Sequence, residues 1–117
     1  MATYGINEFR QIGYMAADPE LKVTSGGNKV TNFRVITNSV WTDGEGVRQE
    51  RAEGFRYELW GEQAEHFCKL VKKGDRVHLL SELRNEAETN QDTNDKKYGI
   101  RFVVTSWLNL ERREKGG

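Results

Sequence analysis

Tryptophans placed beside basic residues are the feature of this sequence with the clearest chemistry. Trp41 follows a run of β-branched residues, and Trp60 shares one face of an alternating segment with Arg56. A flat indole ring can stack on an unpaired base, which contributes about 1 to 3 kcal/mol per base, and a neighbouring guanidinium supplies a cation. We therefore expect Trp41 and Trp60 to be stacking platforms. The alternative is that both rings pack in a core or at an oligomer interface.

Catalytic and metal-binding chemistry lacks its usual residue patterns. The sequence holds two histidines, His66 and His78, and one cysteine, Cys68, and it contains no CxxC, HExxH or GxSxG spacing. Carboxylates are numerous, but nothing in their spacing singles out a converging acid–base pair. We expect no enzyme activity, no metal site, no cofactor and no small-molecule substrate.

The overall charge gives no help to a phosphate-binding function. The chain has 18 basic and 18 acidic residues among 117, whereas affinity for a nucleic-acid backbone comes largely from Lys and Arg. Any such attraction must therefore come from local patches. A single cysteine cannot form an internal disulfide, and the first residues lack the profile of a signal peptide. We expect a cytoplasmic protein with no membrane segment.

The elements that must position these residues follow from the periodicity of the sequence. Alternation predicts strands at 5–14, 29–39, 55–60, 75–83 and 98–110, with a short piece at 20–24 that forms a hairpin across a Ser-Gly-Gly-Asn turn. Apolar residues at helical spacing predict one helix from residue 62, which stops at Gly74. Polar, glycine-bearing composition predicts long loops at 41–54 and 84–97.

This order of elements predicts the fold. Five strands with one short helix between the third and the fourth is the order of the OB fold, an all-β, five-stranded barrel whose sheet face and loops bind oligonucleotides. The length fits one domain, which we assign to residues 1–111, and we expect residues 112–117 to be a disordered end. Tyr98, Phe102 and Trp107 alternate in the last strand and are expected in the core or at a subunit interface.

Four segments of the chain carry motifs of a known family. They read IGYMAADPEL, NFRVITNSVWTD, EGFRYELWGEQAE and LVKKGDRVHLLSELR. The most specific parts are Gly-x-x-x-x-Asp-Pro-Glu from Gly13 to Glu20, Ser-x-Trp from Ser39 to Trp41, and the KKGD that follows the helix. In order and spacing, over about residues 5–110, they resemble the bacterial-type single-stranded DNA-binding protein (SSB) family.

The resemblance implies a site, a partner and an assembly. It places Trp41 and Trp60 at base-stacking positions, and it places basic side chains along the phosphates of the strand at Arg34, Arg56, Lys73 and Arg84. It implies non-sequence-specific binding and protection of single-stranded DNA in replication, recombination and repair, in the bacterial cytosol or nucleoid. The implied assembly is a homo-oligomer without a cofactor, with a tetramer favoured over a dimer.

Several positions depart from the family pattern. Gly54 stands where the family has a third stacking tryptophan, and alternation places Phe55 on the opposite face, where it cannot substitute. A fourth stacking position aligns with Glu88. Acidic residues that would repel phosphates lie nearby at Glu58, Glu62, Glu86, Glu88, Asp92 and Asp95.

These departures favour weaker or differently routed binding than the family norm. The acidic tip that recruits partner proteins in the family has no counterpart in the closing segment ERREKGG, which we expect to reflect either a truncated chain or a relative without that route of recruitment. The alternative function is an OB-fold protein-interaction module derived from the SSB family, with weak DNA binding.

Overall fold

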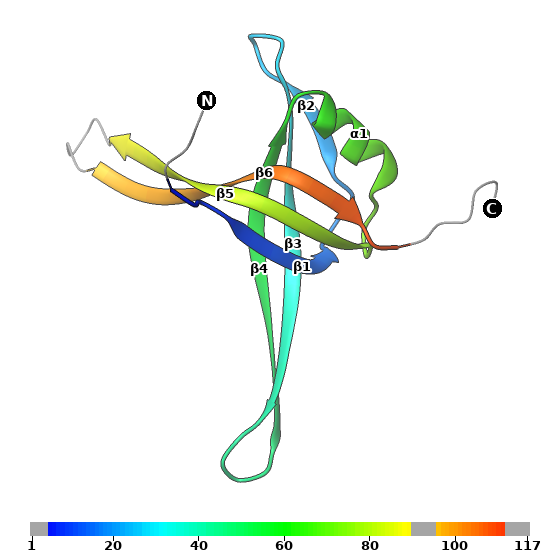
Figure 1. The fold of residues 1–117 in the computed structure, drawn as a ribbon, viewed down its shortest axis with the longest axis vertical. Coiled ribbons are helices and arrows are strands. Elements are labelled where there is room, and N and C mark those ends of the chain that lie inside the picture. Colours follow the sequence, from blue (N-terminus) through cyan, green and yellow to red (C-terminus); the bar gives the residue numbers. More distant parts are fainter. Residues whose placement is uncertain (1–4, 90–95, 112–117) are drawn as a thin grey trace, which may run out of the picture.

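Five strands of the chain close into a barrel (Figure 1). The computed structural model describes residues 5–89 and 96–111. Its elements in chain order are β1 (Phe9–Met15), β2 (Glu20–Val23), β3 (Lys29–Thr42), β4 (Arg48–Trp60), α1 (Glu62–Leu70), β5 (Arg76–Thr89) and β6 (Lys96–Asn109).

The barrel strands follow one another in the order β1, β5, β6, β4 and β3, and the pairing of β1 with β3 closes the circle. All of these pairs are antiparallel except β4 with β6, which are parallel where Glu58 lies beside Val103. β2 is a short arm on the outer edge of β3. The helix therefore stands between the third and fourth strands of the barrel proper, as the sequence predicts.

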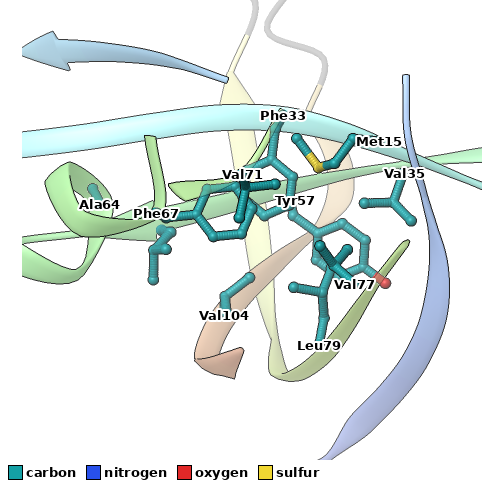
Figure 2. Close-up of a cluster of buried hydrophobic side chains, with 11 residues drawn as sticks. Met15, Phe33, Val35, Tyr57, Ala64, Phe67, Val71, Val77, Leu79 and Val104 are labelled. Carbon is teal, nitrogen blue, oxygen red and sulfur yellow. The ribbon is translucent and has the colours of Figure 1, made fainter. Parts of the chain in front are cut away.

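The core lies inside the barrel, on one face of each strand. Phe33 and Val35 of β3 and Tyr57 and Leu59 of β4 are buried, and each is followed by an outward residue. Figure 2 shows how these side chains meet those of the other elements, namely Met15, Ala64, Phe67, Val71, Val77, Leu79 and Val104. The same alternation turns the polar and basic residues of β3 and β4 toward the outside.

Helix α1 covers one end of the barrel with a narrow apolar face. Ala64 and Phe67 are its buried residues, and the Phe67 ring lies 4.5 Å from that of Phe33, centroid to centroid. The helix ends at Leu70, three residues before the Lys73 expected from the sequence, because Val71 turns to an extended conformation and buries its side chain in the core.

The loop predicted at 41–54 is wrong. β3 and β4 stay paired from Thr37 with Glu53 to Thr42 with Arg48, so they form a hairpin that projects well beyond the barrel (Figure 1). Asp43 accepts hydrogen bonds from the backbone N–H groups of Glu45 and Val47 in the tight turn that joins them. Both faces of this hairpin are largely solvated, so its strands lack the apolar alternation by which a strand is found in a sequence.

The second predicted loop, 84–97, is wrong in the same way. β5 and β6 remain paired as far as Thr89 with Lys96. The predicted disordered end at 112–117 lies outside the described residues. No helix among the described residues has the length and apolar character needed to cross a membrane.

Candidate functional site

A groove crosses the outer face of β3, β4 and β6. It consists of two adjoining hollows that share Asn32 and Arg56 in their walls. The first hollow is completed by Ala17, Asp18, Phe33 and Arg34, and the second by Tyr57, Glu58, Glu86, Ile100, Arg101 and Phe102. We call this surface the β3–β4–β6 groove.

Two arginines form the middle of the groove. Arg34 and Arg56 lie directly opposite each other on β3 and β4, and both are exposed. Among the described residues neither guanidinium forms an ion pair. Like charges directly opposite each other in a sheet are destabilising, so this pair makes a site that an anion would stabilise. Both residues belong to the phosphate-binding set predicted from the sequence.

Trp60 is the last residue of β4 and lies on the same outer face as Arg56. Its side chain is 40% exposed, and its indole N–H donates a 2.8 Å hydrogen bond to Oε2 of Glu58. Its cross-strand neighbour on β3 is Val30, which is buried. The ring is thus held at its polar edge while two fifths of its surface remains open to a ligand.

Glu58 is itself held by an arginine from another strand. Nε and Nη2 of Arg101, on β6, donate to the two carboxylate oxygens of Glu58 at 2.5 and 2.7 Å. This ion pair holds the pKa of the Glu58 carboxyl below its usual value, against the opposite effect of burial. Arg101 is absent from the predicted site, because its place depends on the parallel contact between β4 and β6, which no local pattern in the sequence reveals.

Arg84 and Lys73 lie outside the lining of the groove, and each is linked to a residue that lines it. Arg84 pairs across the strands with Arg101, but its guanidinium is bound to Glu82 at 2.7 Å. The backbone N–H of Lys73 donates at 2.7 Å to Asp18, which lines the first hollow. The structure therefore places Arg34 and Arg56 in the walls of the groove, whereas Arg84 and Lys73 are not among the residues that line it, and the charge of Arg84 is already compensated.

Trp41 is not part of this surface. It is 47% exposed on the projecting hairpin, where it pairs with Gln49. Counting along β3 from Val30, the partner of Trp60, alternation puts Trp41 on the other face of the ribbon. Both predicted stacking rings are open to solvent, but the structure does not bring them together.

Neighbouring residues behave largely as expected. Phe55 points inward and contacts Phe9 and Phe102, so it offers no ring on the side of Gly54. Trp107 is partly buried, and its ring contacts that of Phe67 edge to face at 5.0 Å. The side chains of Tyr98 and Glu88 lie outside the described residues.

Glu62, expected near Trp60, contacts Lys29 at 3.1 Å, and Glu65 shares the same lysine at 2.5 Å. No group of three or more His, Cys, Asp or Glu side chains that could hold a metal ion occurs among the residues that the structure describes.

Known proteins resemble this chain in sequence. Single-stranded DNA-binding protein 1 of Chlorobaculum tepidum is 34% identical over 113 residues, which cover 97% of this chain and 70% of that protein. A single-stranded DNA-binding protein of Xylella fastidiosa is 31% identical over 113 residues, which cover 97% of this chain and 68% of that protein.

Solved structures share the fold. The crystal structure of a deletion mutant of the single-stranded DNA binding protein from Thermus aquaticus superimposes with a TM-score of 0.78 at 26% identity. The match covers 93% of this chain and 52% of that chain, so this chain spans about half the length of the Thermus protein. The Plasmodium falciparum SSB in complex with ssDNA gives a TM-score of 0.76 at 20% identity, over 95% of this chain and 100% of that one.

These matches confirm the OB barrel predicted from the order of the elements. A family model described as the single-strand binding protein family also matches residues 6–110. The chain belongs to the single-strand binding protein family.

Proposed function

We propose that this chain binds single-stranded DNA without sequence specificity in the β3–β4–β6 groove. The observation that carries the proposal is the open ring of Trp60 on the same face as two arginines, Arg34 and Arg56, that have no acidic partner among the described residues. The names of the relatives and the family match support the same conclusion. Protection of exposed strands in replication, recombination and repair, inside the bacterial cell, is the physiological role proposed with it.

The mechanism needs no reading of base edges. A base stacks on the open face of Trp60, and every base has such a face, so stacking tolerates any sequence. The guanidinium groups of Arg34 and Arg56 bind consecutive phosphates, and Lys73 and Arg84, outside the groove, are the two further cations of the proposed set. The proposal includes no catalytic step, cofactor or metal.

Trp41 gives a second contact on the projecting hairpin. Because it lies on the other face of the ribbon from Trp60, a strand that touches both rings must pass around the edge of the hairpin. Arg51 shares the face of Trp41, since its partner Ser39 lies two residues from Trp41 along β3. The bound DNA strand would thus extend beyond the β3–β4–β6 groove onto the hairpin.

Fluorescence titration with a dT homopolymer tests this proposal. Stacking should quench tryptophan emission, and Trp60→Ala should weaken binding roughly five- to 150-fold, the equivalent of one stacked base. Trp107→Phe is the control, because Trp107 is not among the residues that line the groove and its ring packs against Phe67. Unchanged affinity in Trp60→Ala would remove this ring from the site.

A protein-interaction module with weak DNA binding is the second candidate. Two observations favour it: Gly54 offers no ring, and Glu58 and Glu86 bring negative charge into the groove. The same titration separates the two functions. A module of this kind would show no quenching by dT at moderate salt.

We also propose that the chain self-associates into a homo-oligomer, a tetramer in preference to a dimer. The proposal is based on the open edge of β1. Residues Phe9 to Gly13 pair with β5 on one side, and pairing with β3 begins only at Tyr14, which leaves one strand edge open among the described residues. Ile12 and Leu108 add exposed apolar side chains on the adjoining face. The mass of the native assembly in solution tests this proposal, and a monomer would contradict it.

A further inference from the structure

The ring of Trp60 is fixed through a relay of two side chains. The indole N–H donates to Glu58, two residues earlier on the same face of β4, and Glu58 receives two hydrogen bonds from Arg101 on β6. The Glu58 side chain is 12% exposed and that of Arg101 is 37% exposed, so in this Glu58–Arg101 clamp the carboxylate is mostly buried while the arginine remains open in the wall of the groove.

We propose that Glu58 is a positioning residue of the DNA-binding groove, which fixes the plane of the Trp60 ring so that one face stays open for stacking. The inference rests on the proposed function. Although Glu58 is acidic, it would then favour the binding of negatively charged DNA, because it orients the Trp60 ring and not because of its own charge.

The geometry of the clamp is suited to this task. A carboxylate held by two parallel hydrogen bonds from one guanidinium has little freedom to rotate, so its free lone pairs point in a set direction. The only polar atom of the Trp60 side chain, Nε1, donates to this carboxylate, so the hydrogen bond sets the orientation of the ring. Without the carboxylate, a ring that is 40% exposed can rotate among its staggered positions, and that freedom must be given up when a base stacks.

Simple electrostatics predicts the opposite effect for the removal of Glu58. Glu58 lines the second hollow together with Arg56 and Arg101. Its replacement by an uncharged residue removes a negative charge and also frees the charge of Arg101, and both changes should strengthen attraction for phosphates. A weaker complex therefore cannot come from the change in charge.

A double-mutant cycle on dT binding distinguishes the positioning role of Glu58 from the purely electrostatic expectation. With Trp60 intact, Glu58→Leu should weaken binding about two- to tenfold, the range of a single hydrogen bond. In a Trp60→Phe background, where no N–H is present to be held, the same change should leave affinity unchanged or raise it. Tighter binding with Trp60 intact, or equal weakening in both backgrounds, overturns the inference.

Ring mobility in the free protein is the second measurement. Trp41, Trp60 and Trp107 are the three tryptophans of the chain, so the double substitution Trp41→Phe, Trp107→Phe leaves Trp60 as the sole emitter. Time-resolved anisotropy should show faster nanosecond motion of the ring after Glu58→Leu. Glu58→Gln should restore part of the rigidity, because the amide oxygen can still accept from the indole.

The two measurements also separate this inference from the function on which it rests. Unchanged ring motion in Glu58→Leu overturns the positioning role, even if the unmodified chain binds dT. No binding of dT by the unmodified chain overturns the proposed function and the role of Glu58 in it. A thermal melt of each variant shows that it is folded, and Glu58→Ala, which likewise removes the acceptor, takes the place of Glu58→Leu in the cycle if the latter is not.

Discussion

The guanidinium of Arg34 lies over the bare backbone of Gly54 on the neighbouring strand. A Cβ atom built on Gly54 would stand 2.4 Å from Nε and 2.6 Å from Nη2 of Arg34, closer than real contacts allow. Gly54 pairs with Ile36, one outward position beyond the pair of Arg34 and Arg56. The absence of a side chain at position 54 therefore gives Arg34 its place in the groove.

Gly54→Ala should weaken binding to dT while leaving the fold intact. The methyl group displaces the end of a flexible side chain rather than backbone, so we expect the free energy of unfolding to change by less than about 1 kcal/mol. Loss of one ordered phosphate contact should lower the affinity about two- to tenfold. In an Arg34→Ala background the substitution should have no further effect, and a loss of the same size there would contradict the explanation.

The salt dependence of binding should report the two central arginines separately from Arg84. For a single strand each phosphate neutralised contributes about 0.7 to the slope of log K against log salt concentration. Arg34→Ala and Arg56→Ala should each reduce the slope by about that amount. Arg84→Ala should reduce it less, because Glu82 already binds Arg84 at 2.7 Å. Equal slopes for Arg56→Ala and the unmodified chain would exclude Arg56 from phosphate contact.

The sequence predicts the two distinct faces of β3 and β4, because apolar alternation is a local property. It correctly places Phe55 on the opposite face of β4 from Arg56 and Trp60. It also finds the helix, although not the extended conformation at Val71 that ends it, since that end depends on the burial of the Val71 side chain among core residues from other elements.

Features that depend on distant residues are missed. The solvated hairpin that carries Trp41 is held by backbone pairing and reads as a loop. Arg101 meets Glu58 only because β4 and β6 lie side by side and parallel, 43 residues apart in the chain. The sequence shows that Arg101 and Glu58 are oppositely charged. It does not show that they meet beside Trp60, because that contact forms only when the barrel closes.

Gly13→Ala should destabilise the barrel where β1 crosses β3. A Cβ atom at Gly13 would stand 2.5 Å from Cγ1 of Val35 and 2.7 Å from the carbonyl oxygen of Ile36, and the latter is backbone that cannot move aside. We expect a loss of about 1 to 3 kcal/mol in the free energy of unfolding, measured by chemical denaturation. Gly44→Ala is the control, because nothing lies within 4 Å of its added Cβ. Equal stability of the two variants would contradict the close approach.

The ion pair of Glu58 with Arg101 should make stability depend on pH. The hydrogen bonds from Arg101 lower the pKa of Glu58 in the folded chain from an ordinary value of 4.5. A carboxyl with a lowered folded pKa stabilises the native state above its unfolded pKa, and this contribution disappears as the pH falls through the folded pKa. The stabilisation is therefore complete near neutral pH and declines below about pH 4.5.

Glu58→Gln isolates this contribution from those of other carboxyls with lowered pKa values, such as Asp43 and Glu65. At neutral pH the variant should be less stable than the unmodified chain by on the order of 1 kcal/mol, because Arg101 at the surface is partly screened by solvent. This difference in the free energy of unfolding should narrow as the pH is lowered from 5 toward 2, because the Glu58 carboxyl becomes uncharged, like the Gln amide. The difference should change by at most about 2.3RT per pH unit. Urea denaturation at a series of pH values measures this difference, and a constant value throughout would show that the carboxylate charge of Glu58 contributes nothing to folding.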